Sequence, residues 1–213
     1  NLKQFTEDVS HEMRTPLAIM QVKIDTLIND EHINEGQFEQ LNSLQSDIQR
    51  LKQLNNRLIL LAKIDNNQFT ENEKIFVNEM LTQSIANFKE ITQTSINLDD
   101  NHELKIVMDR TLASVLLNNL LTNALKHNLN NRPISVSIYE HSIQVINDGT
   151  TALIHPENIF ERFYKESKKP DSTGLGLSIV KKICDYYGFV PYYRFEHNKK
   201  QHIFEIDFNK KKV

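Results

Sequence analysis

The stretch "NNLLTNALKHN", residues 118–128, decides the fold expected for the second half of the chain. Leucines in and just before it recur at helical spacing and predict a buried helix face: Leu116, Leu117, Leu120 and Leu121. Another face carries polar side chains three and four residues apart, namely Asn119, Asn123, Lys126 and His127. A polar stripe of this kind is ordinarily a solvated helix face. An asparagine oxygen can also bind Mg²⁺, and a lysine one turn on can reach a phosphate, so a nucleotide site is the alternative.

The positions of the glycines carry information because the chain has only five of them. Gly149, Gly174 and Gly176 fall in loops between the predicted elements. The stretch "TGLGLSIV", residues 173–180, leads from such a loop into a helix, whose free N–H groups can hold an anion. A glycine pair before a helix is more often a plain turn, so this pattern is weak evidence when taken alone.

The residues around this helix predict a mixed domain. Helical spacing covers residues 77–91 and 110–127, and a further helix follows "STGLGL" and ends at Gly188. Runs rich in β-branched and aromatic residues predict strands within residues 103–109, 134–140, 142–148, 192–197 and 202–208. This order favours an α+β domain whose helices pack on one face of a sheet.

The N-terminal part has a different period. Apolar residues recur at spacings of three and four from Val9 to Leu27 and again from Phe38 to Leu61, with the polar break "NDEHINEGQ" between them. This pattern predicts a helical hairpin over residues 1–66, followed by a polar linker over 67–74 and the mixed domain over 75–213. Two helices alone cannot shield so long a seam, so we expect a homodimer that forms a four-helix bundle.

Composition excludes several classes of partner. The net charge of −3 leaves no basic footprint for nucleic acid. The single cysteine, Cys184, cannot form an internal disulfide, which fits a reducing compartment. The longest apolar run, Leu58 to Ala62, is too short to span a bilayer. The sequence shows no signal peptide, and its first residue is Asn1 and not an initiator methionine. We expect a soluble piece of a longer protein.

Five stretches of the chain together resemble the sequence boxes of one protein family. "VSHEMRTPL" (9–17), "NNLLTNALKHN" (118–128), "VINDGT" (145–150), "IFERFYK" (159–165) and "STGLGLSIV" (172–180) follow the order of the H, N, first glycine, F and second glycine boxes of bacterial sensor histidine kinases. The resemblance implies a dimerisation and phosphotransfer hairpin, then a two-layer α/β sandwich that binds ATP, of the type shared with gyrase and the Hsp90 chaperone. It also implies that this chain is the cytoplasmic portion of a membrane-anchored sensor kinase, and that this portion makes no contact with the membrane.

The H box assigns roles in the hairpin. By the resemblance, His11 is the phosphoacceptor, and Glu12 orients its ring and accepts its proton. The partner is then the receiver domain of a response regulator, which takes the phosphoryl group on an aspartate. Thr15 matches a polar position that the family links to removing phosphate from the regulator; a purely structural role is the alternative. Pro16 has no N–H for the carbonyl of Glu12, so we expect a bend at this point.

The other four boxes assign the nucleotide site for ATP and Mg²⁺. Asn123 is the expected Mg²⁺ ligand, and Asn147 stands where the family reads adenine. The remaining residues expected to contact the nucleotide are Asn119, Lys126, His127, Gly149, Lys165, Thr173, Gly174, Gly176 and Leu177. Phe160 and Phe163 of the F box are expected to anchor the loop.

Two positions depart from the family pattern. Asn147 replaces the aspartate of the first glycine box, and Thr151 replaces its second glycine. Alternation along a strand should point the neighbouring Asp148 to the opposite side. An amide can accept from adenine but can also flip, which predicts weaker discrimination against GTP than a carboxylate gives. The departures keep open a pseudokinase scaffold as the alternative to an active kinase.

Overall fold

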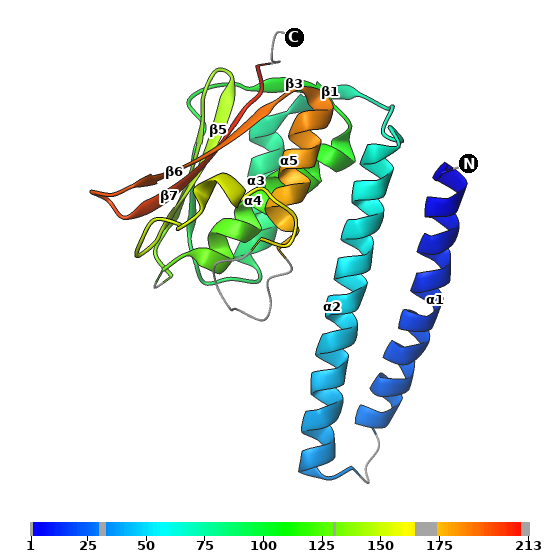
Figure 1. Cartoon of the computed structure of the whole chain (residues 1–213). Helices are drawn as coiled ribbons and strands as arrows, with labels where there is room; N and C mark the ends of the chain where they lie inside the picture. Colours follow the sequence, from blue (N-terminus) through cyan, green and yellow to red (C-terminus); the bar gives the residue numbers. More distant parts are fainter. Residues whose placement is uncertain (1, 30–32, 130, 165–173, 210–213) are drawn as a thin grey trace. The chain divides into compact units, whose positions relative to one another are not determined.

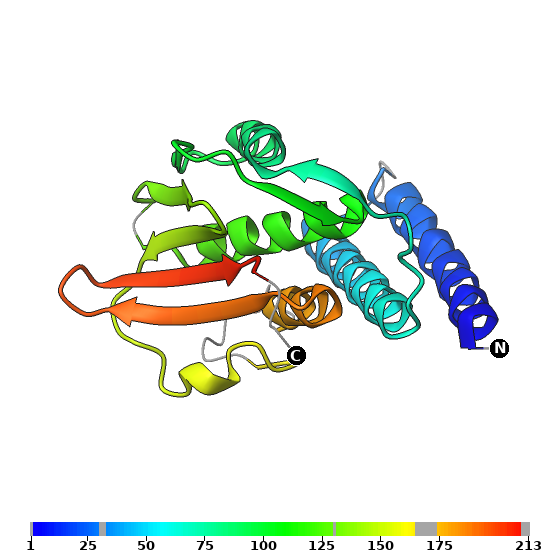
Figure 2. The same cartoon turned by 90° about the horizontal axis from the view of Figure 1, so that it is seen from above.

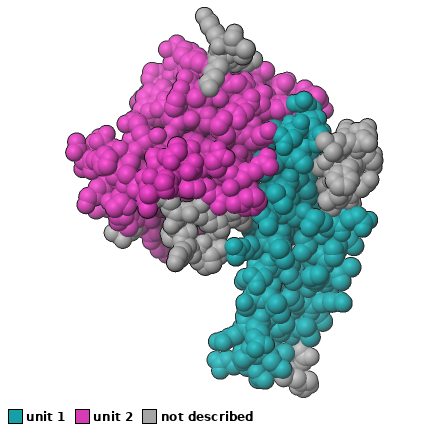
Figure 3. Space-filling model, in the orientation of Figure 1, with its two compact units in different colours: residues 1–68 teal, residues 69–213 magenta. Residues whose placement is uncertain are grey.

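The protein consists of two compact units, residues 1–68 and 69–213 (Figure 3). Its structure, a computed structural model, describes residues 2–29, 33–129, 131–164 and 174–209, and describes only the backbone of residues 2–11. Within these ranges, no helix combines the length and apolar character needed to cross a lipid bilayer.

Unit 1 is a hairpin of two long helices, α1 (Leu2–Ile28) and α2 (Glu35–Asp65), as the apolar spacing predicts (Figure 1). A capping box begins α2, in which Asn34 and Gln37 exchange side-chain to backbone hydrogen bonds. Near the turn, Gln45 of α2 donates to the carboxylate of Asp25 on α1 at 2.8 Å. This bond ties the two helices together next to their connection.

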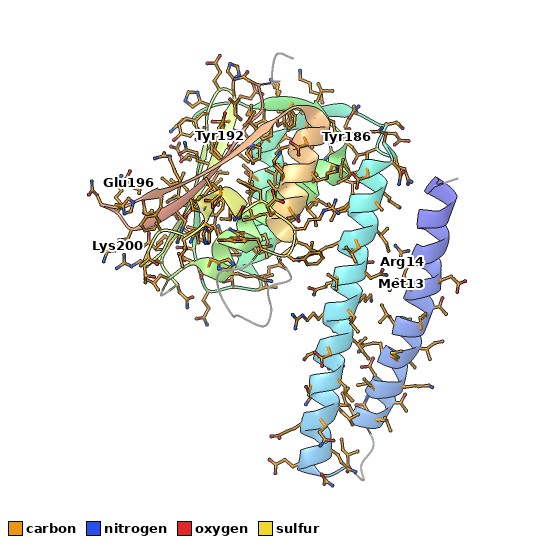
Figure 4. All side chains as sticks on the ribbon, in the orientation of Figure 1. Met13, Arg14, Tyr186, Tyr192, Glu196 and Lys200 are labelled. Atoms are coloured by element: carbon orange, nitrogen blue, oxygen red, sulfur yellow. The ribbon has the colours of Figure 1, made fainter. Side chains whose placement is uncertain are left out.

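Pro16 lies inside α1, and the helix continues beyond it to Ile28. Because proline has no N–H, the carbonyl of Glu12 lacks its usual helical donor. The exposed side chains of Met13 and Arg14 project from this segment (Figure 4). The bend expected here stays a prediction.

The hairpin buries one apolar face and exposes another. Ile24 and Ile48 are buried, whereas a second set of large apolar side chains is more than two-fifths exposed: Met13, Met20, Leu27, Phe38, Leu44, Leu51 and Leu58. A monomer rarely leaves so long an apolar stripe in water.

Unit 2 is built on a five-stranded sheet with the order β2-β4-β5-β7-β6. Among the described strands of this sheet, β2 and β4 pair in parallel and the other pairs are antiparallel. Its strands are β2 (Ile96–Asp99), β4 (Ile134–Ile138), β5 (Ser142–Asp148), β6 (Val190–Glu196) and β7 (Gln201–Asp207). The antiparallel strands β1 (Glu73–Phe76) and β3 (Lys105–Met108) form a separate pair, and Pro156–Asn158 form a short 3₁₀ helix.

Three helices cover one face of this sheet: α3 (Val77–Lys89), α4 (Arg110–His127) and α5 (Gly176–Tyr187) (Figures 1 and 2). Every second residue of β4 and β5 is buried, which is the pattern of a sheet packed on one side. The expected α+β architecture of this part of the chain is therefore confirmed.

Two strands lie outside the predicted set. Residues 73 and 74, expected in the linker, already belong to β1, and β2 follows α3. Each of these strands buries one side chain, Ile75 and Ile96, so neither shows the alternation from which a strand can be predicted.

Candidate nucleotide site

Helix α4 presents the polar stripe predicted from its sequence. Asp109 caps it by accepting a hydrogen bond from the N–H of Leu112, and the expected leucine face is fully buried. On the other side Asn119 and Asn123 are half-buried, while Lys126 and His127 are exposed in the last turn. Positive charge at this end also stabilises the terminal carbonyl groups of the helix.

The N-terminus of α5 lies next to this stripe. A β-carbon at Gly176 would lie only 3.1 Å from Oδ1 of Asn119. The Nδ2 of Asn119 donates to the carbonyl of Val115 at 2.8 Å, which orients the amide. The structure therefore brings the N box and the second glycine box together, and a side chain at 176 would crowd the amide of Asn119.

The F box meets the second glycine box through the backbone. Gly174 has φ +67° and a β-carbon there would lie 2.8 Å from backbone atoms of Phe163, so glycine is required on two counts. The N–H of Phe163 donates to the carbonyl of Gly174 at 2.9 Å. Phe160 is half-buried and Phe163 is exposed. The anchoring role expected for the F box stays a prediction.

The end of β5 supplies an unusual buried amide. Asn147 is 1% exposed, and its Oδ1 accepts no hydrogen bond from any of the described residues. Its Nδ2 donates to the carbonyl of Asp148 at 3.2 Å. A flip would place Oδ1 against that carbonyl, acceptor to acceptor, so this contact opposes the free flipping expected from the sequence.

Asp148 points the other way, as strand alternation predicts. Its carboxylate accepts from Arg132 at 3.0 Å and from Gln201 at 3.1 Å. Thr151 is exposed and is not among the described non-glycine residues with positive φ, so its backbone does not require glycine. The departure at 151 is therefore compatible with the loop conformation.

Gly149 is packed against a histidine that sequence reasoning missed. A β-carbon at 149 would overlap the ring of His202, and the N–H of Gly149 donates to the carbonyl of Lys200 at 2.8 Å. His202 lies opposite Asn147 in the pairing of β5 with β7, and its Nδ1 is 2.8 Å from the hydroxyl of Tyr193. Lys200 is at the end of the β6–β7 hairpin (Figure 4). No motif marks His202; only the strand pairing could have indicated it.

Several of the predicted site residues take no part in the contacts described above. Lys165 and Thr173 lie outside the described residues, and so does the side chain of His11, although its backbone is part of α1. Glu12 and Thr15 are exposed on α1, in the other unit, and Leu177 is half-buried in α5.

The hydrogen-bond donors and acceptors of this site are suited to a nucleotide. The described residues include no group of three or more histidine, cysteine, aspartate or glutamate side chains arranged to hold a metal ion. Asn123 of α4 has an amide oxygen of the kind that can bind Mg²⁺. The buried Oδ1 of Asn147 fits a ligand that donates a hydrogen bond, as the amino group of adenine does.

Two protein families match the two parts of the chain. Residues 1–67 match the "His Kinase A (phospho-acceptor) domain", and residues 108–211 match the "Histidine kinase-, DNA gyrase B-, and HSP90-like ATPase". The predicted H box lies in the first match and the N, F and both glycine boxes lie in the second.

Curated relatives include the heme sensor protein HssS of Staphylococcus aureus strain Newman. It is 30% identical over 195 residues, which cover 87% of this chain and 42% of that protein. HssS of Staphylococcus epidermidis is 28% identical over 188 residues, with 85% and 42% covered. The chain thus spans less than half the length of these relatives.

Solved structures of histidine kinases share the fold. The nucleotide-free catalytic domain of histidine kinase ThkA is 29% identical with a TM-score of 0.52, over 65% of this chain and 97% of that one. Full-length ShkA in complex with AMPPNP has a TM-score of 0.77 at 20% identity, over 96% of this chain and 45% of that one. The second likeness concerns the fold alone.

Proposed function

The chain belongs to the bacterial sensor histidine kinases and carries their phosphoacceptor and ATPase domains, and from this premise we propose that it phosphorylates His11 with ATP and passes the phosphoryl group to an aspartate of a response regulator. A neutral imidazole nitrogen of His11 attacks the γ-phosphorus, and the bond from that phosphorus to the β–γ bridging oxygen breaks. ADP leaves, and Glu12 takes the proton from the other ring nitrogen.

One observation carries the nucleotide assignment. The Oδ1 of Asn147 is a buried acceptor without a partner among the described residues, and leaving such an atom unpaired costs about 1–3 kcal/mol. The amino group of adenine would supply the missing donor, whereas guanine presents a carbonyl oxygen at the same place. Because the amide is oriented by Asp148, the site should favour ATP over GTP more strongly than a freely flipping amide would.

Asn119, Lys126 and His127 face the phosphate side of this site in the proposed complex. Asn123 would hold Mg²⁺, which when bound neutralises charge on the β- and γ-phosphates. The missing side chains at Gly149 and Gly176 leave room for His202 and Asn119, respectively.

Two copies of the chain would pair through the hairpin. The apolar stripe of Met13, Met20, Leu27, Phe38, Leu44, Leu51 and Leu58 lies on two helices and would form the inner seam of a four-helix bundle. The family dimerises in this way in general, and the exposed stripe of this chain supports the same arrangement.

The test is incubation with γ-labelled ATP and Mg²⁺, comparing the wild type with His11→Gln. We expect acid-labile label on the wild type and none above background on the variant, with ATP affinity equal in the two proteins. Label on His11→Gln at the wild-type level would refute His11 as the acceptor. A wild type that binds ATP and stays unlabelled would favour the pseudokinase scaffold.

A further inference from the structure

Asp148, the last residue of β5, uses both oxygens of its carboxylate. Oδ2 accepts from Nη1 of Arg132 at 3.0 Å and Oδ1 accepts from Nε2 of Gln201 at 3.1 Å. The carboxylate side chain is only 13% exposed, although that of Arg132 is 64% exposed. These bonds connect the end of β5 to β7 and to the turn that follows α4.

The backbone of Asp148 is held by the same turn. Its N–H donates to Oδ1 of Asn128, the residue that follows α4, at 3.1 Å. Its carbonyl accepts from the N–H of Leu129 at 3.2 Å, and Leu129 in turn accepts from the N–H of Arg132 at 3.2 Å. The position of this carbonyl is therefore determined by the contacts with Asn128 and Leu129 as well as by the strand.

The carbonyl of Asp148 is also the acceptor for Nδ2 of Asn147, at 3.2 Å. As long as it stays in place, the amide keeps its nitrogen on the carbonyl, and its oxygen has no hydrogen-bond partner among the described residues. If the carbonyl moves away, the amide loses the contact that distinguishes its two orientations, because both fit the same volume. The nitrogen could then face the base and donate to the carbonyl oxygen of guanine.

We propose that Asp148 and Arg132 are positioning residues that hold the Asn147 amide with its oxygen toward the base and so set the selectivity for ATP over GTP. The inference rests on the proposed nucleotide site, and neither residue touches the nucleotide. Their effect reaches the base through one backbone carbonyl. Because the Arg132 side chain is largely exposed, its pairing contributes little to folding stability, so Arg132→Gln should leave the domain folded.

The test measures the affinities of AMPPNP and GMPPNP for the full chain with Mg²⁺, before and after Arg132→Gln. We expect the ATP to GTP affinity ratio to fall roughly fivefold for Arg132→Gln and about tenfold for Asp148→Ala, which loses both side-chain bonds. The distinguishing sign is that GTP-analogue affinity rises while ATP-analogue affinity falls. Arg132→Lys, which keeps the charge, should restore part of the ratio.

The matched control is Arg110→Gln. Arg110 is also an exposed arginine of unit 2 and pairs with Glu73 at 2.6 Å, with 66% of its side chain exposed. This variant should leave the ratio at the wild-type value, which would show that removing an arginine charge from the surface is not enough.

A second variant separates this proposal from the proposed function. If Asn147→Ala abolishes the preference for ATP while Arg132→Gln and Asp148→Ala leave it unchanged, the positioning role is refuted and the nucleotide site stands. If Asn147→Ala itself leaves the ratio unchanged, Asn147 does not read the base and the site assignment fails as well. Equal losses for both nucleotides in Arg132→Gln would also overturn the proposal, because a general structural defect has that signature.

Discussion

The two units of this protein differ in how far the apolar faces of their helices are buried. Helix α4 of unit 2 buries its leucine face inside the unit, and Leu112, Leu116, Leu120 and Leu121 are at most 1% exposed. Unit 1 leaves large apolar side chains of both helices two-fifths or more exposed. A region of the first kind can be stable by itself, whereas one of the second kind needs a partner surface to cover it. We infer that nucleotide binding depends on one copy and the hairpin depends on two.

The largest effect is expected for Leu51→Glu, which places a carboxylate on the exposed apolar stripe of α2. Leu51 is 52% exposed in one copy, and in a symmetric dimer the substitution would remove two buried leucines and place two carboxylates in the seam. The lost burial of two half-exposed leucines and the cost of two carboxylates in an apolar seam together amount to about 4 kcal/mol, so dimer affinity should fall about a thousandfold. Light scattering across a concentration series would measure it.

The control for that experiment is Val107→Glu, which changes an apolar residue of β3 in unit 2 that is 64% exposed. It should leave the mass unchanged, and both variants should bind ATP as the wild type does. A wild type that scatters as a monomer at micromolar concentration would contradict the dimer.

Thr15→Ala tests whether the exposed face of α1 has a second chemical role. Thr15 lies one turn after His11 on the same helix and its side chain is exposed. We expect autophosphorylation to remain and dephosphorylation of the regulator to fall about a hundredfold, the scale on which a misplaced attacking group loses rate. The two rates would be measured with the purified regulator. Equal losses in both would show that Thr15 is structural.

The elements that could be predicted from the sequence are those with a strong period. Helix α4 runs from Arg110 to His127, as its leucines predict, and α5 is followed by Gly188 in the left-handed conformation. Strands β1 and β2 were not predicted because each buries a single residue. A period of two needs at least two buried positions before it can be recognised.

Only the part of the site that lies in local sequence motifs could be predicted. The boxes named Asn119, Asn147 and Gly149, and the structure places each at a contact that depends on its side chain or the lack of one. His202 and Arg132 could not be found because their relevance comes from pairing across the fold. Asn147 meets His202 through a register that joins residues 55 positions apart, which follows from 202 − 147. No local pattern encodes that pairing.

The smallest predicted effect is on the pH dependence of folding stability and concerns Cys184, which is buried in the core of unit 2. Burial raises the pKa of the Cys184 thiol from 9.0 to about 12, with a smaller contribution in the same direction from Asp185. The unfolded chain loses this proton near pH 9 while the folded protein keeps it, so stability falls as pH rises from about 9 to about 12. At pH 10 the loss from this group is about 1.4 kcal/mol.

The measurement is urea unfolding of the wild type and Cys184→Ala at pH 8 and pH 10. The alanine variant will be less stable at both values because it leaves a cavity, but its stability should fall by about 1.4 kcal/mol less between them. In the same samples, native Cys184 should resist alkylation at pH 8 and react after unfolding. Equal pH dependence in the two proteins, together with rapid alkylation of the native chain, would show that the thiol is reached by water and that the core of unit 2 is less closed than its burial indicates.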